Sequence, residues 1–91
     1  MGVYERIFAF VLQNFTFGDA SGLLPDASLL ASGIIDSTGV LELITFIERT
    51  FSVKLGDHDL TPENLDSLNR ITQFVTRKLA ALAPQAQARS A

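Results

Sequence analysis

The apolar residues of this 91-residue chain recur every three or four positions, which is the spacing that puts them on one face of an α-helix. The first stripe of this kind predicts a helix at residues 3–15, and two further stripes predict helices at residues 37–51 and 68–82. No segment keeps the alternation of apolar and polar residues that a strand would show. The three stripes are Tyr4, Ile7, Phe8, Val11, Leu12 and Phe15; Val40, Leu43, Ile44, Ile47 and Phe51, widened by Leu41 and Phe46; and Ile71, Phe74, Val75 and Leu79. The sequence therefore predicts an all-α domain.

Polar residues mark where the later helices begin. Asp36 directly precedes the second stripe and is a residue type that caps helices by accepting first-turn N–H groups. In "TPEN", Thr61 stands at a cap position, Pro62 at the first helical position, and Glu63 in the first turn. This helix must be short, because Asp66 or Ser67 starts the last one. We therefore expect three substantial helices and one short one.

Two connections separate these helices. Residues 16–36 form the longer one, and loops of that length in compact domains are usually functional or carry buried anchors. The segment "PDASLL" is predicted to form a short helical turn with Asp26 or Ser28 as its cap. The shorter connection, residues 52–60, has Gly56 at a turn. The expected anchors are Leu23, Leu24, Leu29, Leu30, Ile34 and Ile35 in the first connection, and Val53, Leu55 and Leu60 in the second.

Residues 1–83 are predicted to form a single domain, and residues 84–91, "PQAQARSA", a flexible C-terminal tail. The apolar stripes can all face one another, so we expect a monomer. The apolar run "IFAFVL" is far shorter than a membrane span, and neither a signal peptide nor a myristoylation pattern is present. We therefore expect a soluble cytoplasmic protein with no membrane partner.

Charge and composition exclude several classes of function. The net charge is −3, and the seven basic residues form no cluster, so nucleic acid is not an expected partner. The chain has no cysteine and one histidine, which excludes thiolate or histidine-rich metal sites. His58 is interpreted as an ordinary polar loop residue. Glu42 and Glu48 lie on an exposed helix face and are poor candidates for a catalytic pair. No enzyme activity and no catalytic residue are predicted.

Ser37 is the remaining candidate for chemistry. On local grounds it is simply the first residue of a helix that Asp36 caps. It also follows a long loop, and it opens a helix whose free N–H groups and positive dipole end favour an attached phosphate. A narrow polar strip, Thr38, Glu42, Thr45 and Arg49 with Glu48 alongside, begins beside it. Such a strip suits a partner that has to reach the serine.

The segment "SGIIDSTGVLELITFIERTFSVKL" resembles the 4′-phosphopantetheine attachment region of acyl and peptidyl carrier proteins. The later segment "DLTPENLDSLNRITQFV" is similar to the helix three to helix four region of the same family, so the resemblance spans about residues 4–82. It implies a four-helix acyl-carrier-protein-like bundle with a long first loop. It also implies that Ser37 carries the 4′-phosphopantetheine, covalently attached, and that Asp36 is the acidic neighbour that helps the transferase handle the coenzyme A pyrophosphate. Gly33 matches the loop glycine.

What the resemblance implies for function is a free-standing carrier that is not itself an enzyme. Such a carrier holds an acyl or aminoacyl group as a thioester on the arm and delivers it to partner enzymes. The implied partners are a phosphopantetheinyl transferase, an acyl- or aminoacyl-activating ligase and a downstream transferase or synthase. Tethering raises the effective concentration of the group at each partner. The positions that match partner-facing residues, together with the residue after the serine, are Thr38, Leu41, Glu42, Thr45 and Glu48.

Two departures from the family pattern bear on the pathway. The residue after the serine is Thr38, where such carriers usually have Leu or Met, and the acidic residues of the strip are joined by Arg49. Fatty-acid synthase carriers are far more acidic there, so the sequence favours specialised or aminoacyl metabolism over primary fatty-acid synthesis. Helix two has more apolar residues than one core-facing stripe needs. Two interpretations fit this excess: a groove between helices two and three for a short cargo chain, or an ordinary hydrophobic core at that place. The alternative function is an unmodified helical adaptor in which Ser37 only caps helix two.

Overall fold

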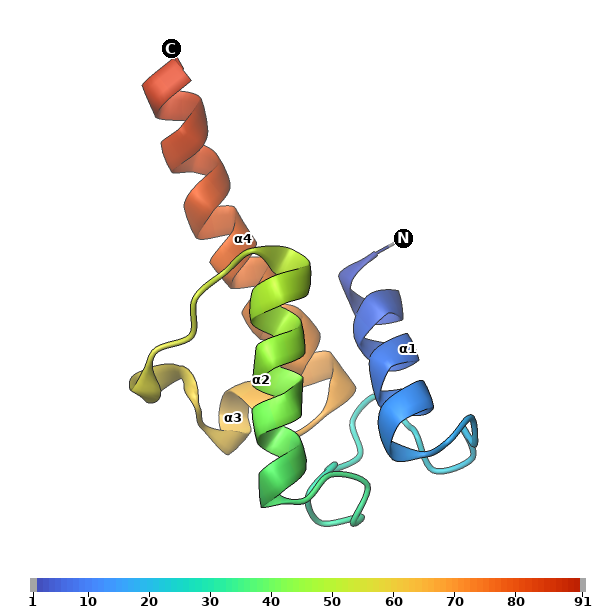
Figure 1. Ribbon diagram of the computed structural model, residues 1–91. Coiled ribbons are helices and arrows are strands. Elements are labelled where there is room, and N and C mark those ends of the chain that lie inside the picture. Colours follow the sequence, from blue (N-terminus) through green and yellow to red (C-terminus); the bar gives the residue numbers. More distant parts are fainter. Residues whose placement is uncertain (1, 91) are drawn as a thin grey trace.

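Four α-helices and one turn of 3-10 helix form the chain in the computed structural model (Figure 1). The structure describes the backbone of residues 2–90 and the side chains of residues 2–82. The helices are α1 (Val3–Phe15), α2 (Ser37–Phe51), α3 (Pro62–Leu65) and α4 (Leu68–Ser90), with the 3-10 turn at Asp57–Asp59. No strand occurs in the described residues. The predicted all-α class is confirmed, as are the bounds of the first two helices.

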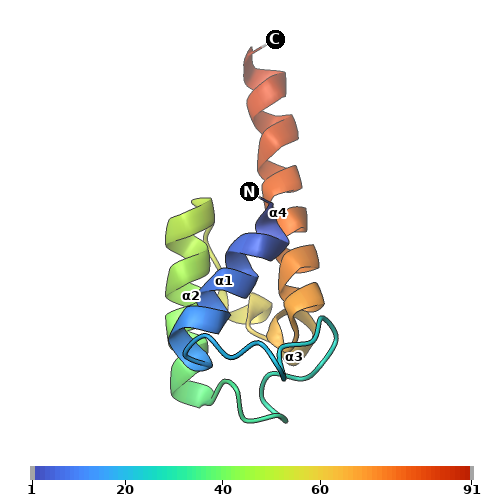
Figure 2. The same ribbon diagram turned by 90° about the vertical axis from the view of Figure 1, so that its right-hand side faces the viewer.

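The helices enclose one apolar core. α1 and α2 run in opposite directions, and α1 lies obliquely across the pair formed by α2 and α4 (Figures 1 and 2). Each long helix contributes side chains from its predicted stripe, and the two connections add their own. The buried apolar residues are Ile7, Val11, Leu23, Leu29, Ile35, Leu43, Ile47, Val53, Leu65, Leu68, Ile71, Phe74 and Val75. This shared burial holds the start of α2 in a fixed place relative to α3 and α4.

The long loop between α1 and α2 is fastened to the junction of α3 and α4. Asp66 accepts hydrogen bonds from the Ser28 hydroxyl at 2.6 Å and from the Leu30 N–H at 3.0 Å. Its backbone carbonyl accepts another from the Leu29 N–H at 2.8 Å. Next to it, the Asn69 side chain donates to Asp26 at 2.8 Å. The loop that leads to Ser37 is therefore tied to the α3–α4 junction, which lies about 30 positions beyond Ser37 along the chain.

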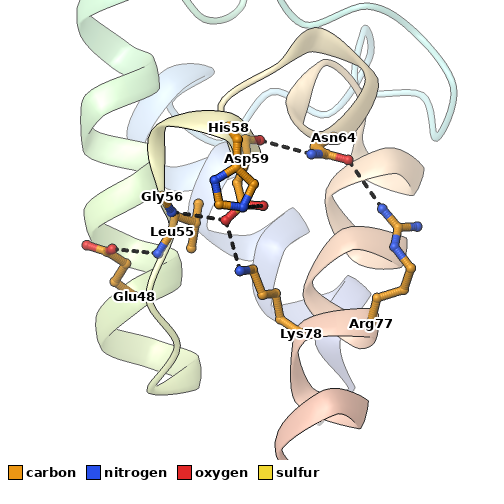
Figure 3. A network of polar contacts seen from close by, with 8 residues as sticks. All are labelled: Glu48, Leu55, Gly56, His58, Asp59, Asn64, Arg77 and Lys78. Atoms are coloured by element: carbon orange, nitrogen blue, oxygen red, sulfur yellow. Dashed lines mark hydrogen bonds and ion pairs between the residues drawn. The ribbon is translucent and has the colours of Figure 1, made fainter.

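The connection between α2 and α3 is fastened by a second polar network (Figure 3). The Lys78 ammonium of α4 lies 2.8 Å from Oδ2 of Asp59, which is only 7% exposed, and the Gly56 N–H donates to the same oxygen at 3.0 Å. These two contacts hold the pKa of the Asp59 carboxyl below its ordinary value. The Glu48 carboxylate of α2 accepts from the Leu55 N–H at 3.0 Å. The connection is thereby joined to α2 and to α4.

The caps follow the predicted residues in part. Ser67 caps α4, because its hydroxyl accepts from the Arg70 N–H at 3.1 Å. Pro62 is the first residue of α3, whereas Thr61 holds the cap position without a side-chain hydrogen bond. The segment "PDASLL" forms turns and not a helix, although the Ser28 hydroxyl does accept from the Ala31 N–H at 2.9 Å. The Ser28 carbonyl also accepts from the Ser32 N–H at 3.1 Å, so a single hydrogen-bonded turn starts at Ser28, one of the two predicted caps, and it does not extend into a helix.

Three of the predicted anchors are exposed. Leu24, Leu30 and Leu60 expose 59%, 44% and 40% of their surface, whereas Leu23 and Leu29 are buried. A loop has no periodicity, so its sequence does not tell which of two adjacent leucines turns inward.

The last helix continues beyond its predicted end near Leu82, since α4 is helical as far as Ser90. The side chains of residues 83–90, and residue 91 as a whole, lie outside the described part of the chain. The predicted flexibility of residues 84–91, and the domain boundary at residue 83, stay predictions.

Candidate attachment site at the start of α2

Asp36 caps α2, as predicted. It has an extended backbone, and its Oδ1 accepts a hydrogen bond from the Gly39 N–H at 2.7 Å. Its backbone carbonyl accepts from the Val40 N–H at 3.1 Å. The Asp36 side chain thus satisfies one orphan N–H group of the first turn, that of Gly39, and the Asp36 carbonyl accepts the first hydrogen bond inside the helix.

Ser37 is the first residue of α2 and is exposed. In the part of the chain that the structure describes, its hydroxyl makes no hydrogen bond, so capping does not occupy it. The cap is Asp36, and the alternative in which Ser37 itself serves as the cap is wrong in that detail. A phosphate ester on this hydroxyl would lie at the positive end of a 15-residue helix. The hydroxyl of Ser37, its exposure and its place at the start of α2 therefore fit the attachment of a phosphopantetheine group.

Gly39 lets α1 approach this end of α2, and the sequence reasoning missed it. Gly39 is buried, and a Cβ atom built there would lie 2.7 Å from Cε1 of Phe15 and 3.1 Å from Cγ2 of Ile35. The absence of a side chain allows the last residue of α1 to pack directly on the first turn of α2. A helical glycine beside a candidate site is the signal that could have indicated this contact.

The predicted polar strip is exposed along α2. Thr38, Glu42, Thr45 and Arg49 are all exposed, and Leu41 exposes 64% of its surface. Glu48 differs from them, because it is half-buried and bonded to the Leu55 N–H. The structure thus brings four of the predicted partner-facing residues, Thr38, Leu41, Glu42 and Thr45, onto the accessible side of the helix that starts at Ser37. Their roles in binding remain predictions.

An apolar cavity of about 200 Å³ lies between the long loop, α2 and α3. The two exposed leucines Leu30 and Leu60 belong to its wall, which explains why these predicted anchors are only partly covered. The complete lining is Leu29, Leu30, Ile35, Val40, Leu43, Leu60, Thr61, Pro62, Leu65 and Asp66. The structure thus shows a hollow between helices two and three, whose lining includes the core residues Leu29, Leu43 and Leu65, and its use by a cargo chain stays a prediction.

Other kinds of site find no support among the described residues. No group of three or more His, Cys, Asp or Glu side chains is placed to hold a metal ion. None of the helices described is both long and apolar enough to cross a bilayer. His58 is exposed, with a ring nitrogen 3.4 Å from Asp59, on the far connection and not beside Ser37.

Similarity to known proteins decides the family. The D-alanyl carrier protein of Streptococcus suis is 30% identical over 81 residues, which cover 89% of this chain and all of that protein. The chain belongs to the carrier-protein family. The D-alanyl carrier protein of Abiotrophia defectiva is 30% identical over 57 residues, which cover 63% of this chain and 72% of that protein. The D-alanyl carrier protein of Streptococcus sanguinis is 26% identical over 66 residues, which cover 72% of this chain and 82% of that protein. No protein-family model matches the chain. Like its relatives, this carrier protein is not itself an enzyme.

Proposed function

We propose that this carrier protein bears a 4′-phosphopantetheine arm on Ser37 and carries an acyl or aminoacyl group on it. The observation that carries the proposal is a serine hydroxyl at the start of a helix that its acidic neighbour Asp36 caps; the hydroxyl is exposed and makes no hydrogen bond to any residue described. When attached, the arm supplies a thiol that holds the cargo as a thioester. The protein's own residues present the hydroxyl, stabilise the phosphate end and offer a docking surface.

An aminoacyl cargo is favoured over a fatty-acyl one. Three relatives are named D-alanyl carrier proteins, and the lightly charged strip of α2 already argued against fatty-acid synthesis. The partners would then be a phosphopantetheinyl transferase, an aminoacyl-activating ligase and a transferase that takes the group onward. D-alanine is the first cargo to try. The apolar cavity would suit a short acyl chain better, so a comparison of both cargoes is informative.

The proposal is tested by an intact mass measurement. The protein is incubated with coenzyme A and a broad phosphopantetheinyl transferase, beside a known carrier as control. We expect the mass of one arm on the wild-type protein and none on Ser37→Ala. A wild-type protein that gains no arm while the control carrier does would refute the proposal. The modified protein is then offered D-alanine, or a short fatty acid, with the matching ligase and ATP.

A further inference from the structure

The face between α1 and α2 carries an apolar groove that the attachment of an arm does not explain. Phe10 of α1 and Phe46 of α2 stack with their ring centroids 4.1 Å apart and their planes at 13°. Both rings are half-buried, and Leu41 stands exposed beside them. We call this surface the α1–α2 groove and define it as Arg6, Phe10, Leu41, Phe46, Arg49 and Thr50.

Two arginines flank the stacked rings. Arg6 on α1 and Arg49 on α2 are both exposed, and no ion pair engages either of them among the side chains that the structure describes. They concentrate positive charge on a chain whose net charge is −3. A pair of exposed cations beside half-buried aromatic rings is complementary to a carboxylate next to an apolar side chain.

The groove is continuous with the start of α2. Glu42 borders the groove next to Leu41 and also lines a polar hollow that includes Asp36 and Thr38. Because α1 and α2 are antiparallel, Arg6 and Arg49 both lie toward the end of the groove that is far from Ser37 (Figure 1). Along the surface the order is therefore acidic near Ser37, apolar in the middle and basic at the far end.

We propose that the α1–α2 groove is a docking site for an enzyme that acts on the arm, and that this enzyme inserts an apolar side chain flanked on its far side by carboxylates. The proposal rests on the proposed function, because it assigns the partner of the same Ser37 end. The partner surface has the opposite charge order: a basic group opposite Glu42, an apolar anchor on Phe10 and Phe46, and acidic groups opposite Arg49 and Arg6. Docking on this surface involves α1 as well as α2.

The probe for the test is the ATP-dependent ligase that charges the Streptococcus suis D-alanyl carrier protein. Its KM and kcat are measured for the arm-bearing wild-type protein and for the variants Arg6→Glu, Arg49→Glu and Phe10→Ala. Arg70→Glu, an exposed arginine of α4 outside the groove, is the matched control. We expect KM to rise about fivefold for each groove arginine, with kcat within about twofold, and no change for the control. Circular dichroism checks that every variant is folded.

A second measurement keeps this test separate from that of the arm. Isotope-labelled Ser37→Ala protein, which cannot be modified, is titrated with the ligase, and the amide signals are followed by NMR. Shifts of α1 amides around Phe10 together with α2 amides around Arg49 support the groove even if Ser37 proves not to be modified. Shifts confined to α2 and α3, or no shifts at all, overturn the docking proposal. Shifts of the groove amides that depend on protein concentration in the absence of ligase would assign the groove to a second copy of this chain, and would also overturn the proposal.

Discussion

Substitutions at Asp36 separate the capping of α2 from any chemistry at Ser37. Asp36→Ala removes the acceptor of the Gly39 N–H, a charge-assisted bond of 2.7 Å at an exposed helix end. The bond from the Val40 N–H goes to the backbone carbonyl of Asp36 and survives. One lost cap therefore costs about 1 kcal/mol, and the lost negative charge at the helix dipole adds up to about 0.5 kcal/mol. In a domain of this size each kcal/mol lowers Tm by about 4–8 °C.

Asp36→Asn keeps an acceptor oxygen and loses only the charge, so it should cost about 0.5 kcal/mol. Ser37→Ala should change stability by less than about 0.5 kcal/mol, because the hydroxyl is exposed and bonds nothing that the structure describes. Urea unfolding followed by far-UV circular dichroism gives these differences. Asp57→Asn, an exposed aspartate of the 3-10 turn, is the control for removing one negative charge.

The same variants are then compared for the initial rate of arm attachment. If the carboxylate takes part in the transfer, Asp36→Asn is slow although its helix is almost as stable as in the wild type, and Asp57→Asn is unaffected. Attachment to Asp36→Asn at the wild-type rate would refute a chemical role and leave Asp36 as a cap alone. An Asp36→Ala protein as stable as the wild type would refute the capping argument itself.

Two further predictions concern the anchors of the connections. Asp66→Ala should lower the free energy of unfolding by about 2 kcal/mol, because the Ser28 hydroxyl and the Leu30 N–H lose a charged acceptor; urea unfolding measures this, and a loss below about 0.5 kcal/mol would contradict it. At Asp59 the prediction is a pH dependence, since Lys78 and the Gly56 N–H lower the pKa of this carboxyl in the folded protein. Its stabilising contribution is complete above about pH 4 and is lost as the pH falls through the lowered pKa, so Asp59→Asn should lose less stability than the wild type between about pH 5 and pH 3. Equal losses of unfolding free energy in the two proteins would show that the Asp59–Lys78 ion pair does not contribute to the pH dependence of stability.

The features that the sequence predicted are the local ones. The stripes of α1 and α2 and the caps, Asp36 for α2 and Asp66 or Ser67 for α4, each depend on residues within one or two helical turns, so their pattern is visible in the chain. The contacts it missed join distant residues. Asp59 pairs with Lys78, although α3 lies between them in the sequence, and Ser28 bonds to Asp66, although all of α2 lies between them in the sequence. Neither pairing has a sequence period from which it could be read.

For the candidate site, the sequence located Ser37 and Asp36 because residue type and position alone mark a helix start. It also placed Glu48 among partner-facing residues, and this role is untested; the structure shows that its carboxylate already accepts the Leu55 N–H. The contribution of α1 to the surface was not foreseen. Phe10 lies outside the predicted stripe of α1, and only the tertiary packing against Phe46 shows why an aromatic residue stands there.

The length of the first connection follows from the contacts it makes. From the end of α1 it has to reach the α3–α4 junction, where Asp66 holds it, and then return to the start of α2 (Figure 2). A shorter loop could join the two antiparallel helices but could not reach that junction. Because the loop, α2 and α3 share the lining of one cavity, the place of Ser37 is set by all three. The bonds of Asp66 therefore orient the candidate attachment site from 29 positions along the chain, and weakening them should disturb partner docking before it unfolds the domain.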